Sequence, residues 1–238
     1  MDHPVAVALI GALALALACQ PSGDDRLATE IVDAPGHTGV GNHDATLAVN
    51  GVRGGGALRG SVDVFSLGLD PGVDDVLVLG FDGGRVPDVE GPDLAVFENP
   101  FDVQGSPGRF IDPVVVEVSA DCSAFVALPH ARITDDPDAP TDDPTQWTGF
   151  AGIEPVYLHA EDNPVDPFSD DAGGDRLDLA TLDPTDPVAA EVLADGALCV
   201  RLSSAVLWID PQTGAPFPAH PASNGADIDG VYAADVIR

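Results

Sequence analysis

The sequence predicts an all-β protein, an antiparallel sandwich or barrel with long loops rich in aspartate and proline. Short valine-rich runs recur along the chain and are separated by clusters of glycine, proline and aspartate, which is typical of strands joined by turns. The 22 prolines work against helices, because proline lacks the backbone donor that a helix needs. Since 45% of the residues are hydrophobic, we expect one β domain with a substantial core.

The predicted strands follow these runs in chain order. They are expected at 61–68, 75–82, 94–97, 113–120, 124–128, 198–203, 205–210 and 229–237. The run at 94–97 (LAVF) is apolar throughout, which predicts a strand with both faces buried. One short helix is expected at 188–195, where VAAEVLAD is the clearest helical pattern.

The N-terminus resembles an export signal. Residues 5–18 form an apolar stretch of signal length that ends at LALAC, so we expect a lipoprotein signal peptide at 1–18 and lipidation of Cys19. Acyl chains on Cys19 would hold the protein on a lipid bilayer, and Gln20 after the cysteine favours the outer membrane or cell surface. The alternative is an ordinary secretory signal with an incidental cysteine. Polar residues at 19–44 then predict a flexible tether before a β-sandwich domain at 45–238.

The charge is strongly one-sided. Forty acidic residues oppose nine basic ones, and the net charge is −31. Such a chain repels phosphate backbones, so we expect no nucleic-acid partner. The negative electrostatic field of the chain instead attracts cations or basic surfaces of other proteins.

Two cysteines remain once Cys19 is assigned to the lipid. Cys122 and Cys199 lie in or beside predicted strands, and an exported protein meets an oxidising compartment. We therefore expect a disulfide between them, with two free buried thiols as the alternative.

Acidic residues gather beside glycine turns at predicted strand ends. Three segments, 87–93, 170–179 and 225–232, carry acids two or three residues apart, and Ca²⁺ prefers several carboxylate and carbonyl oxygens. The alternative is that each aspartate only caps its own turn. The predicted calcium ligands are Asp88, Asp93, Glu98, Asp175, Asp178, Asp227 and Asp229.

The common catalytic motifs are absent. The chain has no HExxH, CxxC or GxSxG motif, and without lysine it can have no Walker A loop. Trp147 and Tyr157 are the predicted stacking residues for a sugar, with Trp208 and Tyr232 as further candidates, although aromatic residues are more often core residues.

Several of these segments together resemble a known family. The segments are SLG (66–68), GPDLAVFENPF (91–101), VVVEVSAD (114–121), GFAGIEPV (149–156), AGGDRLDLA (172–180) and ADIDGVYA (226–233). In this order they resemble blocks of a family of bacterial cell-surface proteins and surface lipoproteins, in which glycine is usual where this chain has Cys122. The resemblance implies a jelly-roll-like β-sandwich outside the cell, similar to carbohydrate-binding modules, and no catalytic reaction.

The expected function is therefore that of an exported surface lipoprotein with a calcium-stabilised β-sandwich. It would act as a binding or adhesion module for carbohydrate or for another surface ligand. Two other functions stay open: a secreted hydrolase that acts on polysaccharide, and a purely structural envelope protein.

Overall fold

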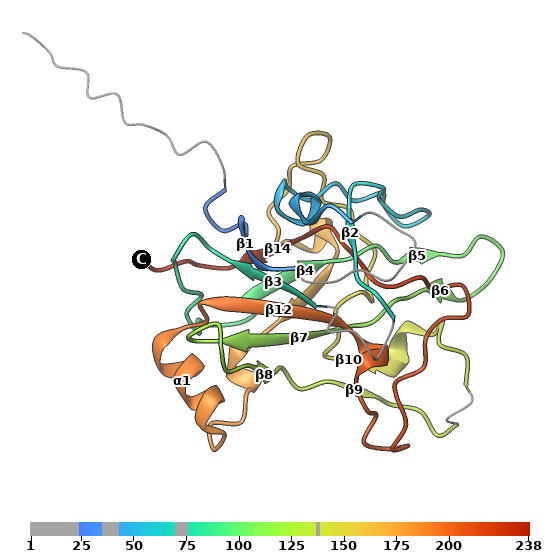
Figure 1. The fold of residues 1–238 in the computed structure, drawn as a ribbon. Helices are drawn as coiled ribbons and strands as arrows, with labels where there is room; N and C mark the ends of the chain where they lie inside the picture. The colour runs from blue at the N-terminus through green and yellow to red at the C-terminus, as the bar shows by residue number, and fades with distance from the viewer. Residues whose placement is uncertain (1–23, 35–42, 70–75, 137–138) are drawn as a thin grey trace, which may run out of the picture.

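Two antiparallel sheets form the body of the protein. The computed structural model describes residues 24–34, 43–69, 76–136 and 139–238. The larger sheet has five strands in the order β1–β3–β12–β7–β8, and the smaller has three in the order β11–β4–β14. Figure 1 shows β3, β12 and β7 side by side in one layer. The fold is all-β, with one short α-helix at the edge.

The strands are short, and the valine-rich runs at 76–80 and 114–119 are two of them. The five-stranded sheet contains β1 (Glu30–Asp33), β3 (Val76–Gly80), β12 (Cys199–Ser204), β7 (Val114–Ser119) and β8 (Val126–Ala127). The three-stranded sheet contains β11 (Asp175–Leu177), β4 (Leu94–Phe97) and β14 (Gly230–Ala233). Three two-stranded pairs complete the set: β2 (Phe65–Ser66) with β13 (Asp227–Ile228), β5 (Phe101–Asp102) with β6 (Arg109–Phe110), and β9 (Ala131–Arg132) with β10 (Trp147–Thr148).

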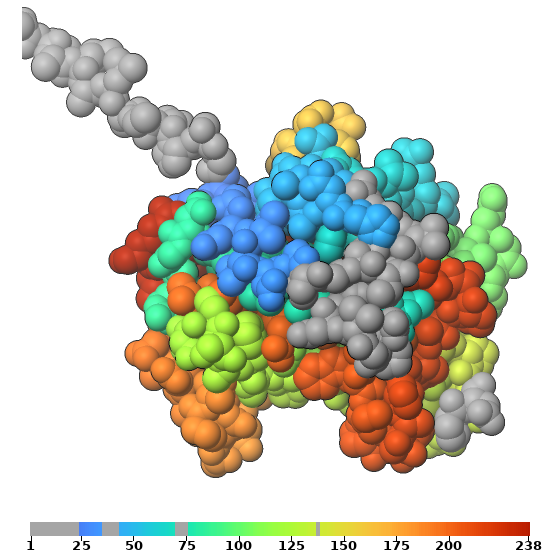
Figure 2. Space-filling model, viewed as in Figure 1, coloured from blue at the N-terminus to red at the C-terminus, as the bar shows by residue number. Residues whose placement is uncertain are grey.

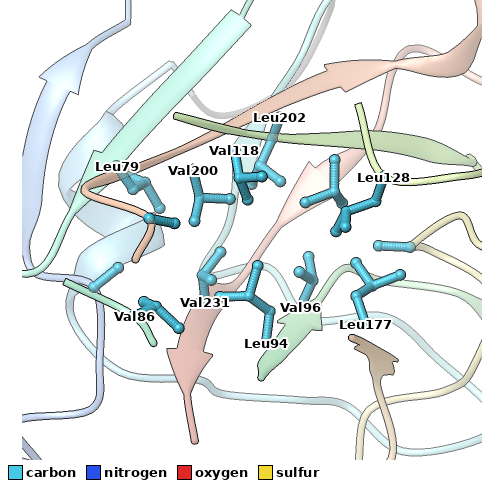
Figure 3. Packing of buried hydrophobic residues seen from close by; sticks show 14 of the residues in the cluster. Leu79, Val86, Leu94, Val96, Val118, Leu128, Leu177, Val200, Leu202 and Val231 are labelled. Carbon is cyan, nitrogen blue, oxygen red and sulfur yellow. The ribbon is translucent and has the colours of Figure 1, made fainter. Parts of the chain in front are cut away.

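The main core lies between the two sheets. Figure 3 shows Val118, Val200 and Leu202 of the larger sheet facing Leu94 and Val231 of the smaller one. All five belong to one cluster of buried side chains. Because alternate residues of a strand point to opposite faces, every second residue of β7 and β12 enters this core.

Strand β4 is buried on both faces, as the sequence predicts. Leu94 and Val96 enter the main core, while Ala95 and Phe97 enter a second cluster with Val156 on the other side. All four residues of the strand are fully buried. A strand covered on both sides has to be apolar throughout, which explains the run LAVF.

The helices are short, and an aspartate caps four of the six in the described ranges. The α-helix α1 (Pro187–Asp195) matches the predicted helix; Asp186 caps it by accepting the backbone N–H groups of Val188 and Ala189. The 3₁₀ helices are η1 (Ala45–Val49), η2 (Pro144–Gln146), η3 (Asp170–Ala172), η4 (Leu179–Thr181) and η5 (Ala205–Leu207). Asp44, Asp143 and Asp178 cap η1, η2 and η4 in the same way. These aspartates therefore have a local structural role, as acceptors for backbone N–H groups.

The predicted disulfide is present. Cys122 and Cys199 are bonded, with their Cα atoms 5.3 Å apart, and the bond joins the turn after β7 to the start of β12. Cys122 has a φ of 61°, in the left-handed region that favours glycine.

Three expectations need correction. Residues 30–33 lie within the predicted tether 19–44, yet they form β1 and pair with β3 at the edge of the larger sheet. Residues 205–210 are not a strand, because the chain turns through η5 after β12 ends at Ser204. Of the predicted strand 61–68, only Phe65–Ser66 pairs in a sheet.

Candidate functional site

Strand β4 divides the predicted calcium ligands between its two ends. Asp93 precedes the strand and Glu98 follows it, so about 16 Å of extended chain separates the two residues. Asp88 and Asp178 lie near Asp93, whereas Asp227 lies near Glu98. The predicted residues therefore do not converge on one shared site.

We call the first group, Asp88, Asp93 and Asp178, the acidic triad. Their carboxylate oxygens lie within 4.8 Å of one another. Asp93 is fully buried, and its two oxygens accept the backbone N–H groups of Val89 and Leu179, both at 2.8 Å. Burial raises the pKa of Asp93, and the charges of Asp178 and Asp88 raise it further. The triad could bind a cation, but Asp93 already has a structural role there.

The second group contains an acid that the sequence did not single out. Asp112 precedes β7 and interacts electrostatically with Glu98 and Asp227; we call these three residues the Glu98 cluster. Glu98 Oε1 accepts the Asp227 backbone N–H at 2.7 Å. Burial, together with the charge of Asp112, raises the pKa of Glu98 well above its usual value, and burial raises the pKa of Asp112 to about 7. Asp112 stands before a valine run as Asp93 stands before LAVF, which is the signal that could have indicated it.

The last two predicted ligands bind backbone groups. Asp175 Oδ2 accepts the Ile153 N–H at 2.9 Å and the Glu154 N–H at 3.4 Å. Asp229 is fully buried, and its two oxygens accept the Arg53 N–H at 2.9 and 3.0 Å. Burial raises the pKa of each carboxyl to about 7. Each of these acids fixes a neighbouring segment of chain.

A separate pocket lies over the glycine-rich segment that follows η1. Its volume is about 600 Å³, within the range of pockets that hold small ligands. We call it the glycine-loop pocket. It is lined by Arg53, Gly54, Gly55, Gly56, Arg59, Gly60, Ser61, Val62, Asp63, Tyr157, His159, Asp162 and Asn163.

Two distant segments build this pocket. The N–H of Gly54 donates to Leu158 O at 3.0 Å, and that of Gly56 donates to Val156 O at 2.9 Å. A side chain on Gly54 would lie 2.5 Å from the carbonyl oxygen of Val156, so only glycine permits this approach. In Figure 2 the blue and cyan segment lies beside the yellow segment near residue 160 at the top of the molecule.

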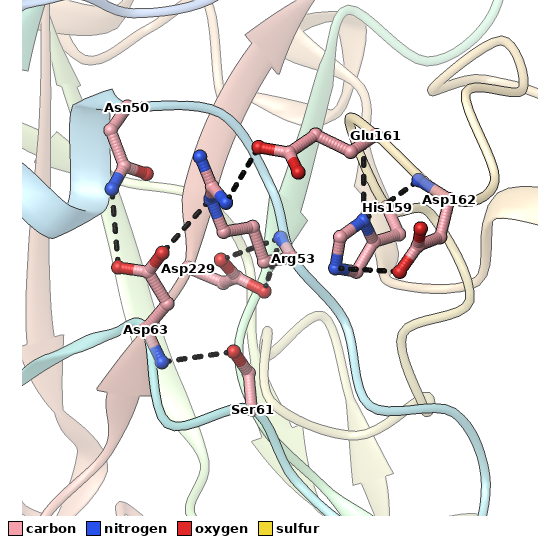
Figure 4. A network of polar contacts seen from close by, with 8 residues as sticks. All are labelled: Asn50, Arg53, Ser61, Asp63, His159, Glu161, Asp162 and Asp229. Atoms are coloured by element: carbon pink, nitrogen blue, oxygen red, sulfur yellow. Dashed lines mark hydrogen bonds and ion pairs between the residues drawn. The ribbon is translucent and has the colours of Figure 1, made fainter.

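Arg53 is the centre of the polar network at the pocket (Figure 4). Its guanidinium pairs with Asp63 and Glu161, each at 2.9 Å, while its backbone binds Asp229. His159 Nδ1 accepts the backbone N–H groups of Glu161 and Asp162 at 3.2 and 3.0 Å, which directs Nε2 toward Asp162. Ion pairs and hydrogen bonds therefore fix the positions of the charged side chains in the pocket wall.

The predicted aromatic residues have different environments. Tyr157 is 43% exposed and lines the glycine-loop pocket. Trp147 is buried in a cluster with Phe150, and its Nε1 donates to Thr141 O at 3.1 Å, so its ring has a packing role. Trp208 packs against the same cluster, and Tyr232 is buried against Phe97. Tyr157 alone of these four is placed to stack on a ligand.

The pocket also contains residues that sequence reasoning missed. Arg59, His159 and Asn163 line it, and none of them is among the site residues predicted from the sequence. Arg59 belongs to the glycine-rich segment 52–60, VRGGGALRG. The density of glycine in that segment was the available signal. Among the residues described by the structure, Arg59 forms no ion pair.

The predicted signal peptide 1–18 and Cys19 lie outside the described residues. Within the described ranges, no helix has the length and apolar character needed to span a bilayer.

These features define an all-β protein with acidic groups at the two ends of β4 and a polar pocket beside the glycine-rich segment. No protein-family model, curated protein or solved structure matches the chain.

Proposed function

We propose that this chain is an exported surface protein whose β domain, a jelly-roll-like sandwich, binds a saccharide in the glycine-loop pocket. The observation that carries the proposal is the position of Tyr157. It presents an exposed aromatic ring in a pocket whose lining also contains charged and amide side chains. A sugar ring has an apolar face for such a ring and hydroxyl groups for polar neighbours.

The polar residues of the pocket offer both kinds of hydrogen bond. Arg59 and Asn163 carry donors, and Asp63 and Asp162 carry acceptors. Because hydroxyl groups donate and accept, a mixed set suits a saccharide better than a purely apolar ligand. The net charge of −31 repels acidic sugars, so the ligand class is neutral.

Two observations support export. The Cys122–Cys199 disulfide is typical of proteins in oxidising compartments, and the N-terminal sequence resembles a lipoprotein signal that ends at Cys19. We propose that lipidation of Cys19 anchors the chain, with the outer membrane or cell surface as its location.

A glycan array followed by calorimetry tests the binding proposal. We expect Tyr157→Ala and Arg59→Ala to weaken binding of a neutral saccharide roughly tenfold each, because each removes a contact worth about 1–1.5 kcal/mol. The affinity should change little with ionic strength, since no net charge is neutralised. Ile209→Ala and Arg238→Ala are matched controls, because both residues are exposed and lie outside the pocket lining. Unchanged affinity in Tyr157→Ala would contradict the proposal.

Cell fractionation tests the anchor separately. Cys19→Ser should move the protein from the membrane fraction to the soluble fraction, because no acyl chain can then be attached. If the variant stays in the membrane fraction, the lipid anchor is wrong, whatever the pocket binds.

A further inference from the structure

Glu98 is a buried carboxylate, and within the described ranges only one of its two oxygens accepts a hydrogen bond. The residue is 3% exposed, and its Oε1 accepts the Asp227 N–H at 2.7 Å. Its Oε2 is also buried and has no hydrogen-bond partner among the described residues. A buried carboxylate oxygen without a partner is costly, because water can no longer solvate it. This oxygen needs a partner that the described polypeptide does not supply.

The neighbours of Glu98 increase this cost. Asp112 is 6% exposed, and Asp227 lies close enough to both acids to interact with them. None of the three forms an ion pair with an arginine or histidine in the described part of the chain. Three carboxylates in one buried place repel each other unless a positive charge lies among them.

The Glu98 cluster has open space beside it, together with oxygen atoms of the backbone and of Ser204. Gly152 has a φ of +81°, and a side chain there would lie 3.3 Å from Glu98 Oε2 and 2.5 Å from the Asp112 carbonyl oxygen. Glycine therefore leaves the space beside these two oxygens open. Asp112 also lines a cavity of about 10 Å³ with Ser204, whose buried Oγ has no partner among the described residues. A cavity of that size holds about one water molecule.

We propose that the Glu98 cluster binds one calcium ion, with Glu98 Oε2 and the Asp112 carboxylate as its charged ligands. Asp227 is not a direct ligand, because its two oxygens already accept hydrogen bonds from Ser66 Oγ and Asn99 Nδ2. It adds negative charge without a direct bond to the ion. Ca²⁺ takes about six to eight oxygen ligands, and carbonyl groups and water supply the others.

The acidic triad lacks the feature that carries this proposal. Both oxygens of its buried member, Asp93, accept backbone N–H groups, and Asp88 is exposed to solvent. The two ends of β4 therefore differ: the Asp93 end is satisfied by the chain itself, and the Glu98 end is not.

Calorimetry of the full chain with CaCl₂, after removal of metals with EDTA, tests the proposal. We expect the wild-type chain to bind one ion and to melt at a higher temperature with calcium than with EDTA. Glu98→Gln and Asp112→Asn should each weaken calcium binding at least about tenfold, because each removes a charged ligand. Asp88→Asn and Asp178→Asn are the matched controls at the other end of β4, and they should bind like the wild type.

Two results would overturn the proposal. One is calcium binding that survives in Glu98→Gln but is lost in Asp88→Asn, which would assign the ion to the triad. The other is a wild-type chain that binds no calcium in calorimetry and melts at the same temperature with calcium as with EDTA. If Glu98→Gln fails the near-ultraviolet circular dichroism check for folding, Asp112→Asn decides.

Discussion

Asp93 and Glu98 lie five residues apart in sequence and at opposite ends of the buried strand β4. Asp93 accepts two backbone N–H groups, whereas one buried oxygen of Glu98 has no hydrogen-bond partner in the part of the chain that the structure describes. The same type of strand-end acid thus has two different uses. At one end it closes a turn, and at the other it borders a cluster of like charges.

Replacement of Asp93 tests the first use. Asp93→Ala leaves the part-buried N–H of Val89 and the buried N–H of Leu179 without acceptors, so we expect a loss of about 2–4 kcal/mol in the free energy of unfolding, measured by urea denaturation. Asp88→Ala is the control, because this residue is exposed and the change should alter stability little. Equal losses in the two variants would mean that the backbone bonds of Asp93 contribute nothing.

Asp175 should make stability depend on pH. Burial raises its pKa from 3.8 to about 7 in the folded state. Below about pH 4 both states are protonated, and between about pH 4 and 7 the unfolded chain releases its proton while the folded chain keeps it, so stability falls as the pH rises. Asp175→Asn keeps an oxygen for Ile153 and Glu154, because both donate to Oδ2.

The measurement is the difference between the two proteins. Relative to the wild type, Asp175→Asn should gain on the order of 2–4 kcal/mol between pH 4 and pH 8, measured by denaturation in EDTA. Other buried acids titrate equally in both proteins, so the difference isolates Asp175. The exposed Asp171→Asn is the control and should follow the wild-type curve. Parallel curves for Asp175→Asn and the wild type would contradict the raised pKa.

The sequence was informative where burial dictates composition. The run at 94–97 is apolar on both faces because both faces are covered, and the helix begins at an aspartate and a proline. β1 escaped prediction because its four residues, EIVD, are exposed at the sheet edge and lie between polar segments. Its place depends on pairing with β3, which no local pattern reveals.

The grouping of the acids could not be predicted for a similar reason. Asp178 reaches Asp93 because β11 pairs with β4 in the register that sets Leu177 opposite Leu94. Asp112 comes near Glu98, 14 residues earlier, because the β5–β6 hairpin between them brings the chain back. The sequence shows that each of these acids lies at the end of a strand. Which other acids lie beside it depends on how the strands pair, and the sequence pattern does not show that.

The disulfide should contribute substantially to stability. The two cysteines are 77 residues apart in sequence. A bond that closes a loop of that length lowers the entropy of the unfolded chain, which stabilises the folded state by about 3–4 kcal/mol. Cys122→Ser with Cys199→Ser should lower the free energy of unfolding by that amount, and dithiothreitol should have the same effect on the wild type. The double variant should be insensitive to dithiothreitol. A wild-type melting temperature that dithiothreitol does not change, under conditions that reduce the bond, would contradict this prediction.

Glu117 and Arg201 form an ion pair across the larger sheet, where they are direct cross-strand neighbours. Glu117 is 3% exposed, and the Arg201 guanidinium also lies 4.2 Å from the ring centre of Phe125. Because Glu117 is buried, its charge depends on this partner. A double-mutant cycle with Glu117→Gln and Arg201→Gln should therefore give a coupling energy of about 1–2 kcal/mol in urea denaturation. The same cycle on Arg176 and the exposed Asp170 should give a coupling near zero, since solvent screens that pair. Similar couplings for the two pairs would show that burial of Glu117 does not strengthen its interaction with Arg201.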